Sequence, residues 1–140
     1  MIERLELIAS KPVNQILKDA ITKGIQEAVI RLNTDIQLGI LNEDSTGTKL
    51  YQIGGEYTLF TQNEKGVGAQ DVDLKDTGAY WRSFRVVILE NGDFAIDSNP
   101  IKGDDNLEAR YGENLEGLND EHTEFIKKVI REEIVKQLLG

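Results

Sequence analysis

The sequence predicts an α+β fold in which a long N-terminal helix and a C-terminal helix pack on a small antiparallel β-sheet. Three observations lead to this prediction: apolar residues keep a helical period at each end of the chain, and between them two strand-like runs flank an Asn-Gly pair. The length of 140 residues suits a single domain spanning residues 1–140.

The first helix is expected over residues 12–32. Ser10 is a suitable N-cap, and Pro12 suits the first turn, where its missing N–H group costs nothing. Apolar residues then recur with a helical period as far as Leu32. Gly24 falls within this apolar stripe, where glycine costs about 1 kcal/mol relative to alanine. We therefore expect another backbone to approach Gly24 closely.

Residues 36–47 lead out of this helix. Ile36 to Leu41 either extend it or begin a separate turn, and residues 42–47 are turn formers. Asp44 and its neighbours resemble the opening of a calcium loop. However, the position that requires a bidentate glutamate holds Ile53. The sequence predicts an ordinary polar turn here.

Residues 47–76 are rich in glycine and aromatic residues and show no regular period. A segment of this length inside a domain is usually functional or ordered by a partner, and its aromatic residues argue against disorder. We expect an extended arm or loop that either folds on its own domain or lies across a neighbouring subunit. One or two additional strands are expected from this segment or from residues 99–110.

A β-hairpin is predicted over residues 80–97. Its first run is rich in aromatic and β-branched residues that alternate with polar ones. Asn91-Gly92 is the preferred pair for a two-residue hairpin turn. Phe94 and Ile96 then fall on one face of the return strand.

The C-terminal part predicts two helices. Residues 107–111 suit a short helix closed by Gly112. Asn119 is the expected N-cap of a helix over residues 119–139, whose acidic first turn favours the helix dipole.

The charge of −9, from 25 acidic and 16 basic residues, disfavours binding to nucleic-acid backbones. This charge either keeps the protein soluble or serves to bind a basic partner. Residues 104–121 hold seven acidic residues and one base, Arg110, and we expect them to mark an acidic face.

The sequence lacks cysteine, which excludes disulfides, thiolate metal sites and a cysteine nucleophile. The first residues are acidic where a signal peptide is basic, and no apolar run is long enough to cross a bilayer. We expect a protein that stays in the cytosol or is packed into a particle assembled there, without a membrane partner or a cofactor.

Catalytic residues are not evident in the sequence. The single histidine, His122, falls in the first turn of the last helix, where an exposed structural role is commoner than acid–base catalysis. Acidic pairs such as Asp71 with Asp73 fall in polar turns, where carboxylates are ordinarily solvated. The sequence therefore indicates a protein that is not an enzyme.

An ordered set of short motifs is more specific than composition. It runs from Gln37-Leu38 through Gly47, Tyr57, Thr61 and Lys65-Gly66 to a Leu-Lys-Asp-Thr-Gly-Ala-Tyr stretch at residues 74–80 that leads into the strand. This set resembles the neck and tail-completion proteins of tailed phages, and Tyr111-Gly112 with Leu115–Leu118 resembles a branch found in phages of Bacteroidetes-type bacteria. The sequence departs from that family in carrying Asp76 before Thr77-Gly78 and in lacking a proline-rich C-terminal segment.

The resemblance implies a structural virion protein that forms a homo-oligomeric ring and binds portal, connector or tail-tube proteins. Because of these departures, three positions in the particle remain possible: tail completion, the head–tail connector ring, or another neck component. The competing hypothesis is an acidic module that inhibits a basic host protein by mimicking DNA, which the charge of −9 motivates.

Candidate subunit-interface residues are aromatic or charged side chains on the arm, the first strand and the acidic region: Tyr57, Phe60, Trp81, Arg82, Arg85, Glu108, Tyr111, Glu113 and Glu116. Trp81 either packs under the helices or anchors an interface. Arg82 and Arg85 either pair with the acidic region of another subunit or are solvated. Thr77-Gly78 is expected to make the sharp entry to the strand.

Overall fold

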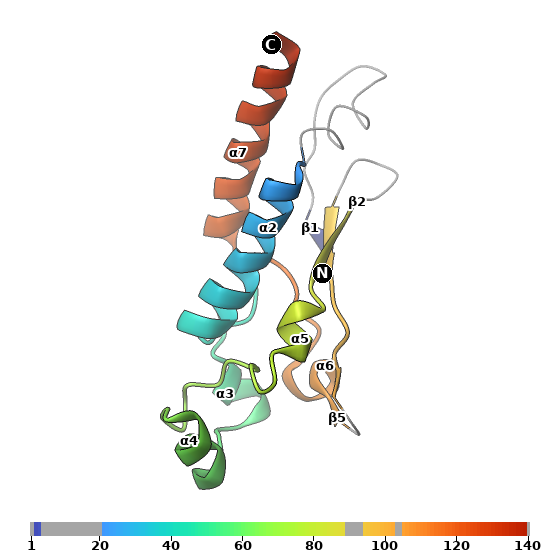
Figure 1. The fold of residues 1–140 in the computed structure, drawn as a ribbon. Coiled ribbons are helices and arrows are strands. Elements are labelled where there is room, and N and C mark those ends of the chain that lie inside the picture. Colours follow the sequence, from blue (N-terminus) through green and yellow to red (C-terminus); the bar gives the residue numbers. More distant parts are fainter. Residues whose placement is uncertain (1, 4–20, 89–93, 103–104, 140) are drawn as a thin grey trace.

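The structure is a computed structural model that describes residues 2–3, 21–88, 94–102 and 105–139 (Figure 1). Helices α2 (Lys23–Arg31) and α7 (Asp120–Leu139) lie side by side, and α2 also contacts the strand β2 (Arg85–Ile88). The short helices gather at the end of the molecule remote from the last turn of α7 (Figure 1). The predicted mixture of helices and antiparallel strands is confirmed.

The larger sheet has three antiparallel strands in the order β1 (Ile2–Glu3), β3 (Phe94–Asp97), β2. β2 and β3 pair from Arg85 opposite Asp97 to Ile88 opposite Phe94, as a hairpin requires, but the predicted Asn91-Gly92 turn lies outside the described residues. Phe94 and Ile96 are both buried, which confirms that they share one face.

The additional strand of this sheet does not come from the segments that the sequence suggested. β1 pairs with β3, because the free edge of β3 is available to residues 2–3. β4 (Ile101–Lys102) and β5 (Asp105–Asn106) come from the 99–110 region but form a separate two-stranded ladder.

The prediction of one uninterrupted helix over residues 12–32 is wrong at its centre. Thr22 has an extended backbone, with φ −65° and ψ 167°, and its hydroxyl accepts a hydrogen bond from the Ile25 N–H at 3.3 Å. Thr22 is therefore an N-cap, and the described helix begins at Lys23. Residues 12–20 lie outside the described part of the chain.

Among the described residues, no backbone approaches Gly24 as closely as expected. Gly24 is exposed, and of the described atoms only the Thr22 hydroxyl oxygen would lie within 4 Å of a Cβ added there, at 3.8 Å. The apolar stripe predicted from the sequence continues past this residue because Ile25 and Val29 turn toward the core.

Residues 36–41 extend the helix, in a wider form. Leu32–Ile40 is a π-helix, η1, and at its end the Leu41 N–H donates to the Ile36 carbonyl at 2.8 Å. Asn33, Thr34 and Gln37 are buried on η1 although they are polar. Buried polar side chains need partners. The Thr34 hydroxyl donates to the Ile30 carbonyl at 2.9 Å, and the segment at residues 115–119 supplies the partners of Asn33 and Gln37.

Asn33 and Gln37 fasten that segment to η1. The Asn33 side chain donates to the Leu115 carbonyl at 2.9 Å and accepts from the Gly117 N–H at 2.7 Å. The Gln37 side chain donates to the Gly117 carbonyl at 2.8 Å and accepts from the Asn119 N–H at 2.8 Å. These contacts fix the chain where it enters α7.

The segment at residues 47–76, expected as an extended arm or loop, contains two short helices, α3 (Leu50–Gly54) and α4 (Leu59–Lys65). Leu50 and Val72 are fully buried, and the Tyr57 N–H donates to the Ala69 carbonyl at 2.8 Å. The segment was expected either to fold on its own domain or to lie across a neighbouring subunit. Its described contacts are with its own domain.

The first strand begins later than predicted, because Ala79–Arg82 forms a helix, α5. Gly78, with φ 84°, is the N-cap of α5, so Thr77-Gly78 leads into a helix and not into the strand. The Thr77 hydroxyl accepts a hydrogen bond from the Ala79 N–H at 3.2 Å. Aromatic residues favour strands only on average, and here the Thr-Gly cap prevails.

Both C-terminal helices are confirmed. α6 (Leu107–Tyr111) ends at Gly112, whose φ is 88°. The Asn119 carboxamide accepts a hydrogen bond from the His122 N–H at 2.8 Å, as expected of the N-cap of α7. The predicted acidic first turn is present in Asp120 and Glu121.

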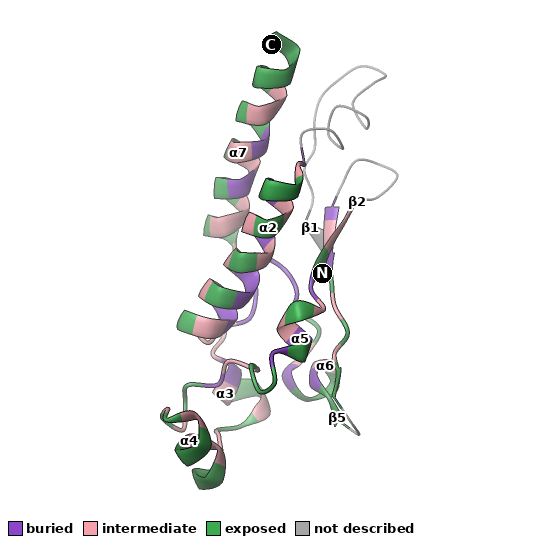
Figure 2. Cartoon of the chain, in the orientation of Figure 1, coloured by how far each residue is buried: buried purple, intermediate pink, exposed green. Residues whose placement is uncertain are grey.

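The core lies between α2, α7 and the inner face of the sheet, and it continues under α3 and α6 (Figure 2). Its largest fully buried apolar side chains are Phe94, Leu38, Leu50, Leu115, Ile126, Val29 and Val72. α4 has no buried residue and stands outside this core.

Candidate docking groove

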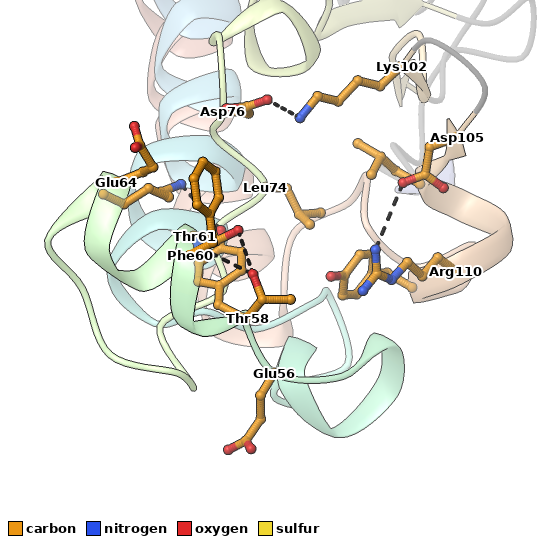
Figure 3. Close-up of a pocket in the computed structure, with 14 residues that line it drawn as sticks. Glu56, Thr58, Phe60, Thr61, Glu64, Leu74, Asp76, Lys102, Asp105 and Arg110 are labelled. Carbon is orange, nitrogen blue, oxygen red and sulfur yellow. Dashed lines mark hydrogen bonds and ion pairs between the residues drawn. The ribbon is translucent and has the colours of Figure 1, made fainter.

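A groove of about 420 Å³ separates α4 from α6 and β5 (Figure 3). Residues from three stretches of the sequence, 56–65, 74–76 and 102–111, meet around it. They are Glu56, Tyr57, Thr58, Phe60, Thr61, Glu64 and Lys65 on the α4 side, and Leu74, Asp76, Lys102, Asp105, Leu107, Arg110 and Tyr111 on the other.

Tyr111 forms the floor of the groove, and it is buried against α3. A Cβ added at Gly54 would lie 2.3 Å from a ring carbon of Tyr111, so only glycine allows this close approach. The Arg110 guanidinium lies 5.3 Å from the same ring, and its Nε donates to the Gly54 carbonyl at 3.1 Å. Burial raises the pKa of Tyr111, which keeps the phenol neutral.

α4 is bounded by local signals at both ends. The Thr58 hydroxyl accepts a hydrogen bond from the Thr61 N–H at 3.2 Å, as an N-cap does. Gly66 ends the helix in the left-handed region, with φ 67°, and its N–H donates to the Gln62 carbonyl at 2.8 Å.

A polar network ties α4 to the rest of the molecule. Lys65 Nζ lies 2.5 Å from Asp73 Oδ1, and the Tyr57 hydroxyl donates to the same oxygen at 2.9 Å. Lys65 also donates to the Lys75 carbonyl at 2.6 Å. Desolvation by burial opposes the charge on Lys65, but the hydrogen bonds to Asp73 and Tyr57 prevail and raise the pKa of Lys65. Burial is also the main cause of the raised pKa of Tyr57.

The outer face of α4 presents two adjacent apolar side chains. Leu59 is 72% exposed and Phe60 is 73% exposed. Phe60 also lines the groove (Figure 3), whereas Leu59 is not one of the lining residues. Contiguous apolar patches on a surface, in contrast to single exposed apolar residues, mark interaction sites.

Ion pairs border the far side of the groove. Lys102 pairs with Asp76, and Arg110 NH1 lies 3.9 Å from Asp105. On the α4 side, Glu56 and Glu64 lie at the edge of the lining residues (Figure 3). Neither makes an ion pair with another described residue. The α4 side therefore carries uncompensated negative charge.

Three of the interface residues predicted from the sequence meet at this groove, namely Tyr57, Phe60 and Tyr111. Trp81 does not line the groove. It is partly buried and packs against the core, as the first of its two predicted roles requires. Its indole N–H donates to the Asp73 carbonyl at 3.0 Å, and a Cβ at Gly39 of η1 would lie 2.9 Å from its ring.

The two arginines form local contacts within the chain. Arg82 belongs to α5 and not to the strand, and it donates to the Thr77 carbonyl at 3.2 Å. Arg85 lies in β2 and pairs with Asp97 of β3 at 2.6 Å. Neither side chain contacts residues 105–121 in the described part of the chain.

The acidic region of residues 104–121 does not form a uniform acidic face. Glu116 is buried and accepts hydrogen bonds from the Tyr80 hydroxyl, at 3.0 Å, and from the Ser98 hydroxyl. Desolvation, together with the neighbouring Glu116, raises the pKa of Glu108. Glu113 is exposed. Only some of these acids are therefore available to a partner.

His122 is partly buried and has a structural contact. Its Nδ1 lies 2.7 Å from the Gln37 carboxamide oxygen, next to the N-cap of α7.

The polar turn predicted over residues 42–47 is confirmed, since one Asp44 carboxylate oxygen accepts hydrogen bonds from the N–H groups of Thr46 and Thr48 at 2.9 and 3.1 Å. The described residues include no cluster of histidine and acidic side chains suited to a metal ion.

Sequence reasoning missed several groove residues. Thr58 and Lys65 belong to α4 or its N-cap, and the signals of this helix, Thr58 as N-cap and Gly66 as C-cap, were present in the sequence. Leu74, Lys102 and Arg110 carried no signal, because only tertiary packing brings their segments together.

Comparisons with protein-family models, with curated proteins and with solved structures give no match for this chain. Among the described helices, none combines the length and the apolar character needed to cross a bilayer.

Proposed function

We propose that this chain is a structural subunit of a tailed-phage particle, in the neck or tail-completion region that joins head to tail. In this role it binds further copies of itself and neighbouring virion proteins such as portal, connector or tail-tube proteins. Its work is done by shape and by contact surfaces, without a reaction.

The observation that carries this proposal is the exposed pair Leu59 and Phe60 on α4, beside the groove. About 25 cal/mol is gained for each Å² of apolar surface removed from water, so a partner that covers this pair is stabilised there. The groove adds shape to this apolar surface, and the polar network of Lys65 fixes α4 in place.

The position at the neck rests on the ordered motifs that resemble neck and tail-completion proteins. Several of these motifs take part in the groove or its supports: Tyr57 and Thr61 line it, and Lys65-Gly66 closes α4. The motif residues thus occur at the groove that we propose as a contact surface, which supports a role in assembly.

Phage complementation tests the proposal. A phage lacking this gene is supplied with the natural chain, with Phe60→Asp, or with Phe125→Asp as a matched control. Phe125 is another exposed phenylalanine, 55% exposed on α7, and it does not line the groove. We expect Phe60→Asp to reduce infectious titre by about 100-fold or more, as loss of about 3 kcal/mol of contact energy would, and Phe125→Asp to have little effect.

Mass spectrometry of purified particles supplies the second measurement. We expect a fixed copy number in each particle and antibody labelling at the head–tail junction. Absence of the chain from particles, together with a one-to-one complex with a basic host protein, would refute the virion role and favour the acidic inhibitor.

A further inference from the structure

The last turns of α7 present a second exposed apolar surface, far from the groove (Figure 1). Val135, Leu138 and Leu139 are 52%, 65% and 83% exposed. Their i, i+3, i+4 spacing places them on one face of the helix. This surface and the groove occupy opposite ends of the same molecule.

We propose that the two surfaces bind each other between copies, so that the last turns of α7 of one copy occupy the groove of the next. This inference rests on the proposed function, for which it identifies the contact between subunits. Val135, Leu138 and Leu139 would cover Leu59 and Phe60 and enter the groove above Tyr111.

Charge supports this pairing. Lys136 is the only charged residue from Ile134 to Leu139. The α4 side of the groove offers Glu56 and Glu64, whose charges have no ion-pair partner among the described residues. Lys136 is therefore available to pair with Glu56 or Glu64 of the next copy, while Glu132, one turn before Val135 on the same face, has to remain outside the groove.

The polarity of the helix supports it as well. The carbonyl groups of a last helical turn have no partner within the helix, and cations near them are favourable. Lys102 and Arg110 stand on the opposite wall of the groove, where both side chains are about half exposed. Their present partners, Asp76 and Asp105, are surface acids, and such pairs contribute only about 0–1 kcal/mol, so they exchange readily.

A contact between two different surfaces of one chain is heterologous. It leaves a free groove at one end and a free α7 at the other, so it continues until the chain of subunits closes. A ring in a phage neck requires this kind of interface. Each copy contributes one groove and one α7, and the geometry of closure sets the number of copies.

Disulfide trapping provides a direct test, because the natural chain has no cysteine. Thr61→Cys places a thiol in the groove and Leu138→Cys places one on α7. Neither side chain is fully buried, so neither change opens a cavity. Glu121→Cys, exposed in the first turn of α7, is the matched control. The variants are mixed at about 0.15 M salt, which limits repulsion between the negative chains, and are then oxidised.

We expect a covalent dimer from Thr61→Cys mixed with Leu138→Cys, at least about 10-fold more than from Thr61→Cys mixed with Glu121→Cys. Equal trapping in the two mixtures would overturn the proposal. Trapping of Leu138→Cys with itself at the same level would also overturn it, since this would indicate a symmetric contact.

Mixing of two blocked variants gives an independent test. Phe60→Asp blocks the groove but leaves α7 intact, and Leu138→Asp does the reverse. Sedimentation should show each variant as a monomer and their mixture as a dimer that grows no further. A mixture that stays monomeric contradicts the contact, whereas the virion role is judged separately, by the presence of the chain in particles.

Discussion

At the scale of single residues, Glu116 is one of two buried acidic side chains in the described residues, the other being Asp44. The Tyr80 hydroxyl donates to Glu116, and burial with the adjacent Glu116 raises the pKa of Tyr80 far above its ordinary value. Tyr80 therefore remains a donor at any physiological pH. Burial and the neighbouring Glu116 disfavour the ionised form of Glu108 and so raise its pKa.

Glu108 should make stability depend on pH. Desolvation and Glu116 raise its folded pKa above 4.5, so the folded state holds this proton more tightly than the unfolded state does. Its contribution to stability is thus greatest below the ordinary pKa and is lost as pH rises through the raised pKa. We expect Glu108→Gln to increase the melting temperature at about pH 7 and to change it little at about pH 3.5.

Glu113→Gln is the control for this measurement, because Glu113 is exposed in the same region. Thermal unfolding at the two pH values gives the comparison. The same gain for both variants would mean that overall charge, and not the contact with Glu116, sets the effect.

Two glycines should respond to alanine in opposite ways. Gly54→Ala places a Cβ 2.3 Å from the buried Tyr111 ring, and we expect it to destabilise the fold by about 1–3 kcal/mol. Gly24→Ala places a Cβ 3.8 Å from the Thr22 hydroxyl oxygen, an ordinary contact, and should increase stability by about 0.4–1 kcal/mol, because alanine leaves the unfolded chain less conformational freedom. Urea unfolding measures both; a neutral Gly54→Ala would show that the ring can move away.

At the scale of elements, α4 differs from the other helices of the described chain in how it is held. It has no buried residue. Its attachment depends on Asp73, which pairs with Lys65 and accepts a hydrogen bond from the Tyr57 hydroxyl. By contrast, α2 and α7 are held by apolar contacts. A helix fixed by polar bonds can present apolar residues outward, which suits a contact surface.

Asp73→Ala should therefore loosen α4 alone. We expect the free energy of local opening to fall by about 1–3 kcal/mol over residues 57–66, because Lys65 and Tyr57 lose their shared acceptor. Hydrogen exchange followed by mass spectrometry measures this, with α2 and α7 as internal references. Asp71→Ala is the control, since Asp71 is exposed and bonds only locally, to the Gly68 N–H at 2.8 Å. Equal loosening in α2 would contradict a local role for Asp73.

At the scale of the whole molecule, η1 joins distant parts of the chain. Its Asn33 and Gln37 bind residues 115–119 through side-chain hydrogen bonds between residues that are 80 or more positions apart in the sequence. These buried polar contacts come from a π-helix, and π-helical turns are frequently found at functional sites. The two long helices are thereby held in one arrangement, with the groove at one end and the last turns of α7 at the other.

Asn33→Ala should weaken the entire fold. The Leu115 carbonyl and the Gly117 N–H would lose their partners within the protein, and we expect a loss of about 2–4 kcal/mol. Asn63→Ala, on the exposed surface of α4, should change stability by less than about 0.5 kcal/mol. Denaturant unfolding compares them, and a similar small effect of both would show that water replaces the lost contacts.

The elements that the sequence predicted best are those with local signals. α7 and α6 begin at asparagine caps, and Gly112 closes α6 as expected. The prediction failed where a local signal was weighed too lightly against periodicity. Thr22 interrupts the first helix, and Thr77-Gly78 opens α5 within an apparent strand.

The sequence by itself determined the mixed fold class, the Asn119 cap of α7, the end of α6 at Gly112, the shared face of Phe94 and Ile96, and three aromatic residues of the groove. These depend on dihedral preferences and on spacing along the chain, which are local. Only the tertiary structure decided that β1 completes the sheet, that Glu116 is buried, and that Leu74, Lys102 and Arg110 meet α4. Such contacts join residues far apart in sequence, and their energy exists only once packing brings them together.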